Sequence, residues 1–227
     1  MLDGHVHFNH SMNQFIIWKN RHRLLLSHCY MFICYKSKLF YRKTMATPVV
    51  TMNQIDLPAL IRNCPDFPRK GILFRDINPL FRTEHALNYI SNEFHRRFNN
   101  TTVDSIAGIE SRGFVIATAL ALNFDKGLIM IRKAGKLPGH TIKKSYDVEY
   151  GSAVMELQKD AIKPRQNVLI ADDLIATGGS ATAAAHLIEE LGGNVTGFAF
   201  VMELTRLKGA NKLRTLGYKV QSLVVYD

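Results

Sequence analysis

The chain has 227 residues, 47% of them hydrophobic, a length and composition that suit one domain with a full α/β core. No run of 18 apolar residues occurs, so the sequence predicts no transmembrane helix and no membrane partner. The formal net charge of +10 could indicate a nucleic-acid partner, but seven of the 29 Lys and Arg residues lie in residues 1–45 beside one acid, Asp3. The rest of the chain carries only a mild positive excess, which suits a protein that binds phosphates and predicts no nucleic-acid partner.

Residues 1–45 differ in composition from the rest of the chain. They contain five of the nine histidines and the only tryptophan, and they are basic and poor in acids. A segment translated from an upstream start, an organellar targeting peptide and a binding arm could each have these features. The sequence MATP from Met45 resembles an ordinary start. We therefore expect a basic N-terminal extension over residues 1–45, poorly ordered or processed, and one domain over residues 46–227.

The three cysteines, Cys29, Cys34 and Cys64, are an odd number and lack the spacing of metal ligands. This usage favours free thiols in a reducing cytosol over disulfide bonds. We therefore expect a cytoplasmic protein, or an organellar one if residues 1–45 are a transit peptide.

The domain is expected to begin with helices. Apolar residues at helical spacing predict one helix over Met52–Asn63, which the prolines that follow would end, and a second over Thr83–Phe98. Apolar runs then predict buried strands at Asp104–Ile109 and Gly127–Ile131, with a helix over Gly113–Leu122 between them.

A long connection, Gly135–Ser152, follows these strands and is bracketed by glycines. Connections longer than about 12 to 15 residues are usually functional lids or disordered, so we expect a flexible lid loop here. Further strands are predicted at Asn194–Glu203 and, at a sheet edge, at Gln221–Tyr226. Strands that alternate with helices predict an α/β fold, a single domain with a mainly parallel central sheet flanked by helices.

The segment Asn167–Thr182, NVLIADDLIATGGSAT, carries the strongest functional signal. Its apolar run has no polar alternation, which is typical of a central parallel strand, and this strand is expected to end at Asp172 and Asp173. Two glycines then remove the side chains that would keep a ligand from the backbone, and Ser180 can cap the helix that follows.

This order of parts predicts a site for a sugar phosphate. The free N–H groups and positive dipole at the helix start would bind a phosphate. Asp172 and Asp173, at the carboxyl end of the strand, would repel a phosphate and should accept hydrogen bonds from sugar hydroxyls instead. The plain alternative is a strand, turn and helix whose acids are merely solvated. Neither G-x-x-x-x-G-K-[ST] nor G-x-G-x-x-G follows the strand, which argues against kinase-type and dinucleotide-type loops.

The sequence DDLIATGG, residues 172–179, resembles the phosphoribosyl-pyrophosphate (PRPP) motif of the type I phosphoribosyltransferases. Four further segments narrow the resemblance to the branch of that family that uses adenine. They are FPRKGILFRDINPLF (67–81), IAGIESRGFVIATALA (106–121), IRKAGKLPG (131–139) and VEYGSAVMELQKDAI (148–162). The resemblance implies the type I fold with a small hood, a homodimer, and conversion of adenine and PRPP to AMP and pyrophosphate in purine salvage.

Within this resemblance, three groups of residues would bind PRPP. The 5′-phosphate would contact Ala176, Thr177, Gly178, Gly179 and Ser180; the ribose Asp172 and Asp173; and the pyrophosphate Glu110, Ser111, Arg112, Lys136 and Tyr150. Arg132 and Lys133 are further basic candidates, although a lysine considered alone is as often a solvated surface charge. Relatives often carry a cis peptide bond between the residues that match Glu110 and Ser111.

The adenine site is expected at Leu73, Phe74 and Arg75. Phe74 matches the phenylalanine that stacks on adenine, with neighbouring main chain reading the base edge. Taken alone, an aromatic residue in this apolar stretch is more often part of a core.

Glu149 is the candidate general acid/base, and Arg112 and Lys136 are the other expected catalytic residues. A carboxyl group shielded by a closed lid can have its pKa raised and exchange a proton with a purine nitrogen. Taken alone, Glu149 would be a surface acid. The oxopurine branch of the family usually places its acid/base just inside the phosphate loop, where this chain has Ile175 or Ala176. Neither transfers a proton, which favours adenine.

The resemblance also implies Mg²⁺, held mainly by substrate oxygens and water, with no metal site formed by the protein alone. Two other functions stay open. A regulator that senses PRPP and binds nucleic acid through a basic arm would need neither Glu149 nor Phe74. A transferase for another base, such as xanthine or a pyrimidine, would share the PRPP site.

Overall fold

The computed structural model describes residues 54–148 and 151–227, which contain a seven-stranded sheet and a separate two-stranded ribbon. The large sheet has the strand order β5-β6-β4-β3-β7-β8-β9. Its strands are β3 (Ser105–Ile109), β4 (Gly127–Lys133), β5 (Thr141–Val148), β6 (Gly151–Gln158), β7 (Asn167–Ile175), β8 (Asn194–Leu204) and β9 (Val220–Tyr226). The five strands from β4 to β9 in this order pair in parallel, whereas β5 and β6 pair antiparallel at one edge. The predicted mainly parallel sheet is confirmed, as is the edge position of the last strand.

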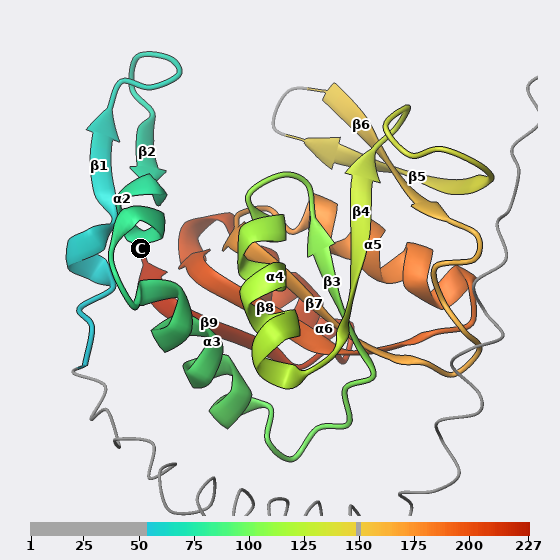
Figure 1. The fold of residues 1–227 in the computed structure, drawn as a ribbon. Helices are drawn as coiled ribbons and strands as arrows, with labels where there is room; N and C mark the ends of the chain where they lie inside the picture. Colours follow the sequence, from blue (N-terminus) through green and yellow to red (C-terminus); the bar gives the residue numbers. More distant parts are fainter. Residues whose placement is uncertain (1–53, 149–150) are drawn as a thin grey trace, which may run out of the picture. The chain divides into compact units, whose positions relative to one another are not determined.

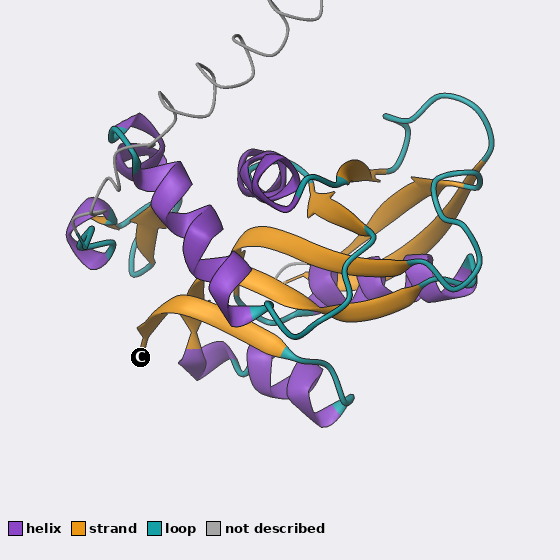
Figure 2. Ribbon diagram, turned by 60° about the horizontal axis from the view of Figure 1, so that its bottom comes forward, coloured by secondary structure: helices purple, strands orange, loops and turns teal. Residues whose placement is uncertain are grey.

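Helices cover both faces of the sheet (Figures 1 and 2). They are α2 (Asn78–Arg82), α3 (Ala86–Arg97), α4 (Gly113–Phe124), α5 (Gly179–Glu190) and α6 (Gly209–Thr215), with 3₁₀ turns η2 (Pro58–Leu60) and η3 (Thr205–Leu207). Successive side chains of β7 point to opposite faces: Leu169 and Ala171 pack with α3 and α4, while Val168 and Ile170 pack with α5 and α6. Because both faces are buried, the central strands have apolar residues without alternation. No helix in this described part of the chain is long and apolar enough to cross a membrane.

The start of the domain differs from its prediction. The described part of the predicted helix over Met52–Asn63 contains only the turn η2, after which β1 (Arg62–Pro65) pairs antiparallel with β2 (Leu73–Asp76). The helix prediction is wrong because the pairing of this segment with β2 outweighs a weak local preference for helix. The second predicted helix is confirmed as α3, but it begins only at Ala86, after His85 with a left-handed φ of 63°.

The connection Gly135–Ser152 also differs from the expected loop, because most of it is strand. β5 pairs along its full length with β6, from Thr141 opposite Gln158 to Val148 opposite Gly151. Among the β5 side chains that the structure describes, Ile142 and Tyr146 pack on the core from one face, and the residues between them are polar. The segment for which composition indicated a flexible lid loop thus contains β5 and the start of β6.

Candidate active site

A polar cavity of about 490 Å³ opens where β3 and β7 end and α4 and α5 begin. It is lined by Glu110, Ser111, Arg112, Lys133, Lys136, Asp172, Asp173, Leu174, Ala176, Thr177, Gly178 and Ser180. The structure thus brings together the expected PRPP-binding residues from three separate segments, apart from Gly179, Arg132 and Tyr150. Gly179 is the first residue of α5. Glu149 and Tyr150 lie outside the described residues.

The loop after β7 has a tightly fixed backbone. Gly178 precedes α5 with a left-handed φ of 79°, and a Cβ atom there would lie 3.1 Å from the backbone of Gly209. The N–H of Gly209 donates to the carbonyl of Ala176 at 3.0 Å. No side chain caps α5, so the expected capping role of Ser180 is wrong; the left-handed Gly178 occupies the cap position instead. The N–H groups of the first turn of α5 therefore have no partner within the helix and can face an anion.

Asp172 and Asp173 form a buried acidic pair, with exposures of 8% and 5%. They lie inside β7, which runs on to Ile175, and not at the predicted strand end. Arg112 Nε lies 2.5 Å from Asp173 Oδ2, and the N–H of Asp173 donates to Asp172 Oδ1 at 2.8 Å. Burial raises the pKa of Asp172 well above its ordinary value, and the charge on Asp173 raises it further. The pair therefore resists carrying two full charges at once.

Glu110 connects the cavity to the β4–β5 segment. Its carboxylate accepts hydrogen bonds from Arg132 Nε at 3.2 Å, from the N–H of Lys133 at 3.0 Å and from Lys136 Nζ. Burial would raise the pKa of Glu110, but these donors outweigh burial and hold the pKa below its ordinary value. The peptide bond between Glu110 and Ser111 is cis, as the family resemblance implied.

A second, mainly apolar cavity of about 310 Å³ adjoins the first and shares Leu174 and Ala176 with it. It is lined by Pro68, Arg69, Ile72, Leu73, Phe74, Arg75, Leu174, Ala176, Leu204 and Leu207. All three residues expected around adenine are among them. Phe74 makes an edge contact with Phe67, with ring centroids 5.2 Å apart, and the Arg112 guanidinium carbon lies 5.7 Å from the Phe74 ring centroid. Arg75 is held by Asn63 and lies 4.1 Å from the ring centroid of Tyr226.

Sequence reasoning missed several residues of the two cavities. Leu174 follows the acidic pair directly, and its place could have been found from that position alone. Leu204 ends β8, and Leu207 lies in the turn η3 that follows it. Carboxyl ends of parallel strands meet at one edge of a sheet, so strand order would have indicated this region. Gly209 had no sequence signal, because its role depends on close packing against the loop of Ala176, Thr177 and Gly178.

Comparisons with known proteins agree with this arrangement. Residues 80–225 match the family described as the phosphoribosyl transferase domain. An adenine phosphoribosyltransferase of Cenarchaeum symbiosum is 50% identical over 172 residues, which cover 76% of this chain and 100% of the relative. The crystal structure of adenine phosphoribosyltransferase from Thermoanaerobacter pseudethanolicus is 42% identical with a TM-score of 0.72, over 75% of this chain and 98% of that one. The enzyme of Saccharomyces cerevisiae, solved with an imino-altritol bisphosphate and adenine, is 44% identical with a TM-score of 0.69, over 74% and 96% of the two chains.

The raised pKa of Asp172 predicts that Asp172→Asn stabilises the fold while it weakens the site. The amide can still accept the N–H of Asp173, but it removes the cost of a buried charge. We expect a gain of about 1 kcal/mol, or about 2 to 4 °C in Tm. Because the pKa of Asp172 is raised in the folded state, the parent loses stability as pH rises from the ordinary carboxyl pKa toward the raised one. The difference in Tm between Asp172→Asn and the parent should therefore widen from about pH 4 upward. Because the sequence predicts that Asp172 binds ribose hydroxyls, ribose 5-phosphate should bind about tenfold more weakly or worse.

Asp173→Asn is the matched control for this prediction. It removes the charge that pairs with Arg112, so its Tm should fall. Equal gains in both variants, or a gap that narrows as pH rises, would contradict the assignment of the pKa shift to Asp172.

Proposed function

Because this chain belongs to the adenine phosphoribosyltransferases of the phosphoribosyltransferase family, we propose that its two adjoining cavities bind PRPP and adenine. The reaction converts adenine and PRPP to AMP and pyrophosphate, a step of purine salvage, and makes the chain a pentosyltransferase. The observation that carries the site assignment is the shared wall of Leu174 and Ala176, which joins a polar, charged cavity to an apolar one. A sugar phosphate and a flat base linked at one carbon atom need such a pair of neighbouring sites.

PRPP binding would exchange the partners of the buried charges. We assign the 5′-phosphate to the N–H groups of the loop 176–180 and the ribose hydroxyls to Asp172 and Asp173. Arg112, now on Asp173, and Lys136, now on Glu110, both line the polar cavity, and we assign the pyrophosphate to them. A pyrophosphate group offers both of them more negative charge than a single carboxylate does.

Electrostatic stabilisation and positioning then carry most of the catalysis. The bond from ribose C1 to pyrophosphate breaks largely before the bond to adenine forms, which leaves positive charge on the sugar. Asp172 and Asp173 lie beside that charge, and Arg112 and Lys136 stabilise the leaving group. Adenine would pack on Phe74 between Leu73 and Arg75, within reach of main-chain groups that read its edge.

Glu149, with Tyr150 beside it on the pyrophosphate side, is the group that we assign to proton transfer with the adenine ring. Support comes from its place in the segment VEYG and from the chemistry of the phosphate loop, where Ile175 and Ala176 hold no proton-transferring group. The hairpin of β5 and β6 on either side of Glu149 packs on the core through Tyr146 and Met155.

Mg²⁺ fits this site as an ion carried mainly by the substrate. Among the described residues, no group of three or more His, Cys, Asp or Glu side chains is placed to hold a metal ion. The cavity does offer oxygen donors at Asp172 and Asp173, the ligand type that Mg²⁺ prefers. When bound to PRPP, the ion would neutralise leaving-group charge.

We place the enzyme in the cytoplasm, which suits the free thiol of Cys64.

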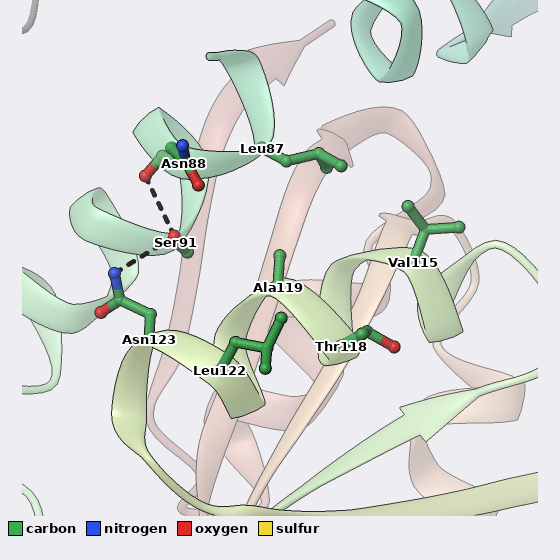
Figure 3. A pocket seen from close by; sticks show the side chains of 8 residues that line it. All are labelled: Leu87, Asn88, Ser91, Val115, Thr118, Ala119, Leu122 and Asn123. Atoms are coloured by element: carbon green, nitrogen blue, oxygen red, sulfur yellow. Dashed lines mark hydrogen bonds between the residues drawn. The ribbon is translucent and has the colours of Figure 1, made fainter. Parts of the chain in front are cut away.

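A homodimer is supported by an uncovered apolar face. In the groove between α3 and α4, Figure 3 shows Val115 and Leu122 among the lining side chains, with exposures of 37% and 80%. Leu128 and Met130 of β4 are 38% and 41% exposed and point to the same face, since their neighbours Ile129 and Ile131 pack toward α5. Several large apolar side chains exposed on one face are typical of a subunit interface.

A version of the chain that begins at Met45 should convert adenine and PRPP to AMP in the presence of Mg²⁺. Because the base cavity is apolar and no acid lies inside the phosphate loop, rates with hypoxanthine, guanine, xanthine and orotate should be at least about a hundredfold lower. The assay follows AMP and pyrophosphate by chromatography. A preference for any other base would contradict the proposal, and PRPP binding without turnover of any base would favour the regulator.

Glu149→Gln should lower kcat with adenine by about 10² to 10⁴, because the amide cannot exchange a proton, and it should change KM for PRPP little. Steady-state kinetics measure both parameters. Glu84 is an exposed acid in the turn before α3, so Glu84→Gln is the matched control and should keep parental rates. A Glu149→Gln enzyme as fast as the parent would exclude the assigned proton transfer.

Replacing Leu122 and Met130 together by glutamate should separate the subunits, because two charges would be buried at the proposed interface. Sedimentation equilibrium would then report a monomer. Leu216→Glu changes an exposed leucine that directly follows α6 and should leave the dimer intact. A double variant that stays dimeric would place the interface elsewhere.

A further inference from the structure

Glu156 of β6 is a buried acid that the proposed mechanism does not use. Its exposure is 2%, and it lies in register with Arg132 of β4 and Lys143 of β5, in the interior of the antiparallel edge of the sheet. A carboxylate in such a place is retained only where donors satisfy its charge. The identity of those donors therefore indicates what the residue does.

The donors of Glu156 are mainly backbone groups of one turn. Glu156 Oε1 accepts the N–H of Lys136 and the N–H of Leu137, both at 2.8 Å, and the Thr141 hydroxyl lies 3.4 Å from Oε2. Burial would raise the pKa of Glu156, but the N–H groups of Leu137, Lys136 and Gly135 outweigh burial and hold the pKa below its ordinary value. The acid is thus ionised at neutral pH and fixes the backbone that follows β4.

That backbone carries a cation into the polar cavity. Lys136 Nζ pairs with Glu110, and Arg132 Nη1 donates to the carbonyl of Lys136 at 3.1 Å. The amide, carbonyl and ammonium groups of Lys136 are therefore each held, by Glu156, Arg132 and Glu110 respectively. Glu110 lines the cavity, and Arg132 lies at the end of β4, close to Lys136 in sequence. Of the three partners, only Glu156 comes from another strand and lies outside the cavity lining. Its contact can persist when a ligand takes the ammonium group from Glu110.

We propose that Glu156 is a positioning residue, which holds the N–H groups of Lys136 and Leu137 so that the Lys136 ammonium faces the part of the cavity that binds pyrophosphate. This inference rests on the proposed function only in the assignment of pyrophosphate to Lys136. Glu156 does not touch the ligand. Its effect on pyrophosphate binding must therefore pass through Lys136.

A double-mutant cycle on pyrophosphate binding tests this coupling. Glu156→Gln keeps the size of the side chain and an acceptor oxygen but removes the charge that strengthens both hydrogen bonds. We expect titration calorimetry to give an affinity about three- to tenfold lower than that of the parent. In a Lys136→Met background, Glu156→Gln should lower the affinity no further, because the group that it positions is gone.

Asp104→Asn is the matched control. Asp104 also accepts a main-chain N–H, that of Asn167 at 2.8 Å, but at the opposite end of β7 from the cavity. Because Asp104 has a purely structural role, Asp104→Asn should shift Tm and leave pyrophosphate affinity at the parental value.

Equal losses from Glu156→Gln in both backgrounds, no loss in either, or a parent that does not bind pyrophosphate would each overturn the inference. A parent that shows the coupling but turns over no adenine would overturn the proposed function and leave this inference standing. The two ideas can therefore fail separately.

Discussion

The structure depends on the neutralisation of buried negative charge near the carboxyl ends of the central strands. Asp173 and Glu110 are almost fully buried, and each is satisfied by a cation or a main-chain N–H from a neighbouring segment. Asp172 forms no ion pair within the described part of the chain, and burial, together with the charge on Asp173, raises its pKa well above the ordinary value. A buried carboxylate without a partner would destabilise the fold strongly. The positions of Arg112 and Lys136 are thus fixed by stability before any ligand arrives.

The same constraint prepares the site for a ligand that carries both hydroxyls and phosphates. Hydroxyls can replace Arg112 as partners of the acids, and phosphates can replace the acids as partners of the cations, so no charge is left alone when partners change. The loop at Gly178 contributes a third, neutral element, because the N–H groups at the start of α5 have no side-chain cap and are available to an anion. Preorganised groups of this kind need little rearrangement during the reaction.

The sequence was most informative where the residues of the candidate site are neighbours along the chain. The strand, acids, glycines and helix around Asp172 are covalent neighbours, so their meeting follows from order alone, and the parallel core follows from apolar runs. Pairings across the sheet were not accessible in this way. The ion pair of Glu110 with Lys136 joins residues 26 positions apart, and β1 forms only because β2 returns to it. The capping role given to Ser180 was wrong because the left-handed Gly178 takes that position.

The hairpin of β5 and β6 illustrates why a polar segment can belong to the active site without being a loop. Tyr146 of β5 packs on the core, and burial raises the pKa of its hydroxyl, with further contributions from the charges of Asp172 and Glu110. These contributions place Tyr146 within electrostatic reach of both acids. Glu156 of the paired strand meanwhile holds the turn that carries Lys136. One strand of the hairpin thus carries a tyrosine whose pKa responds to the charges of Asp172 and Glu110, and the other strand orders the turn that carries Lys136, so a change in the pairing of β5 with β6 would affect both.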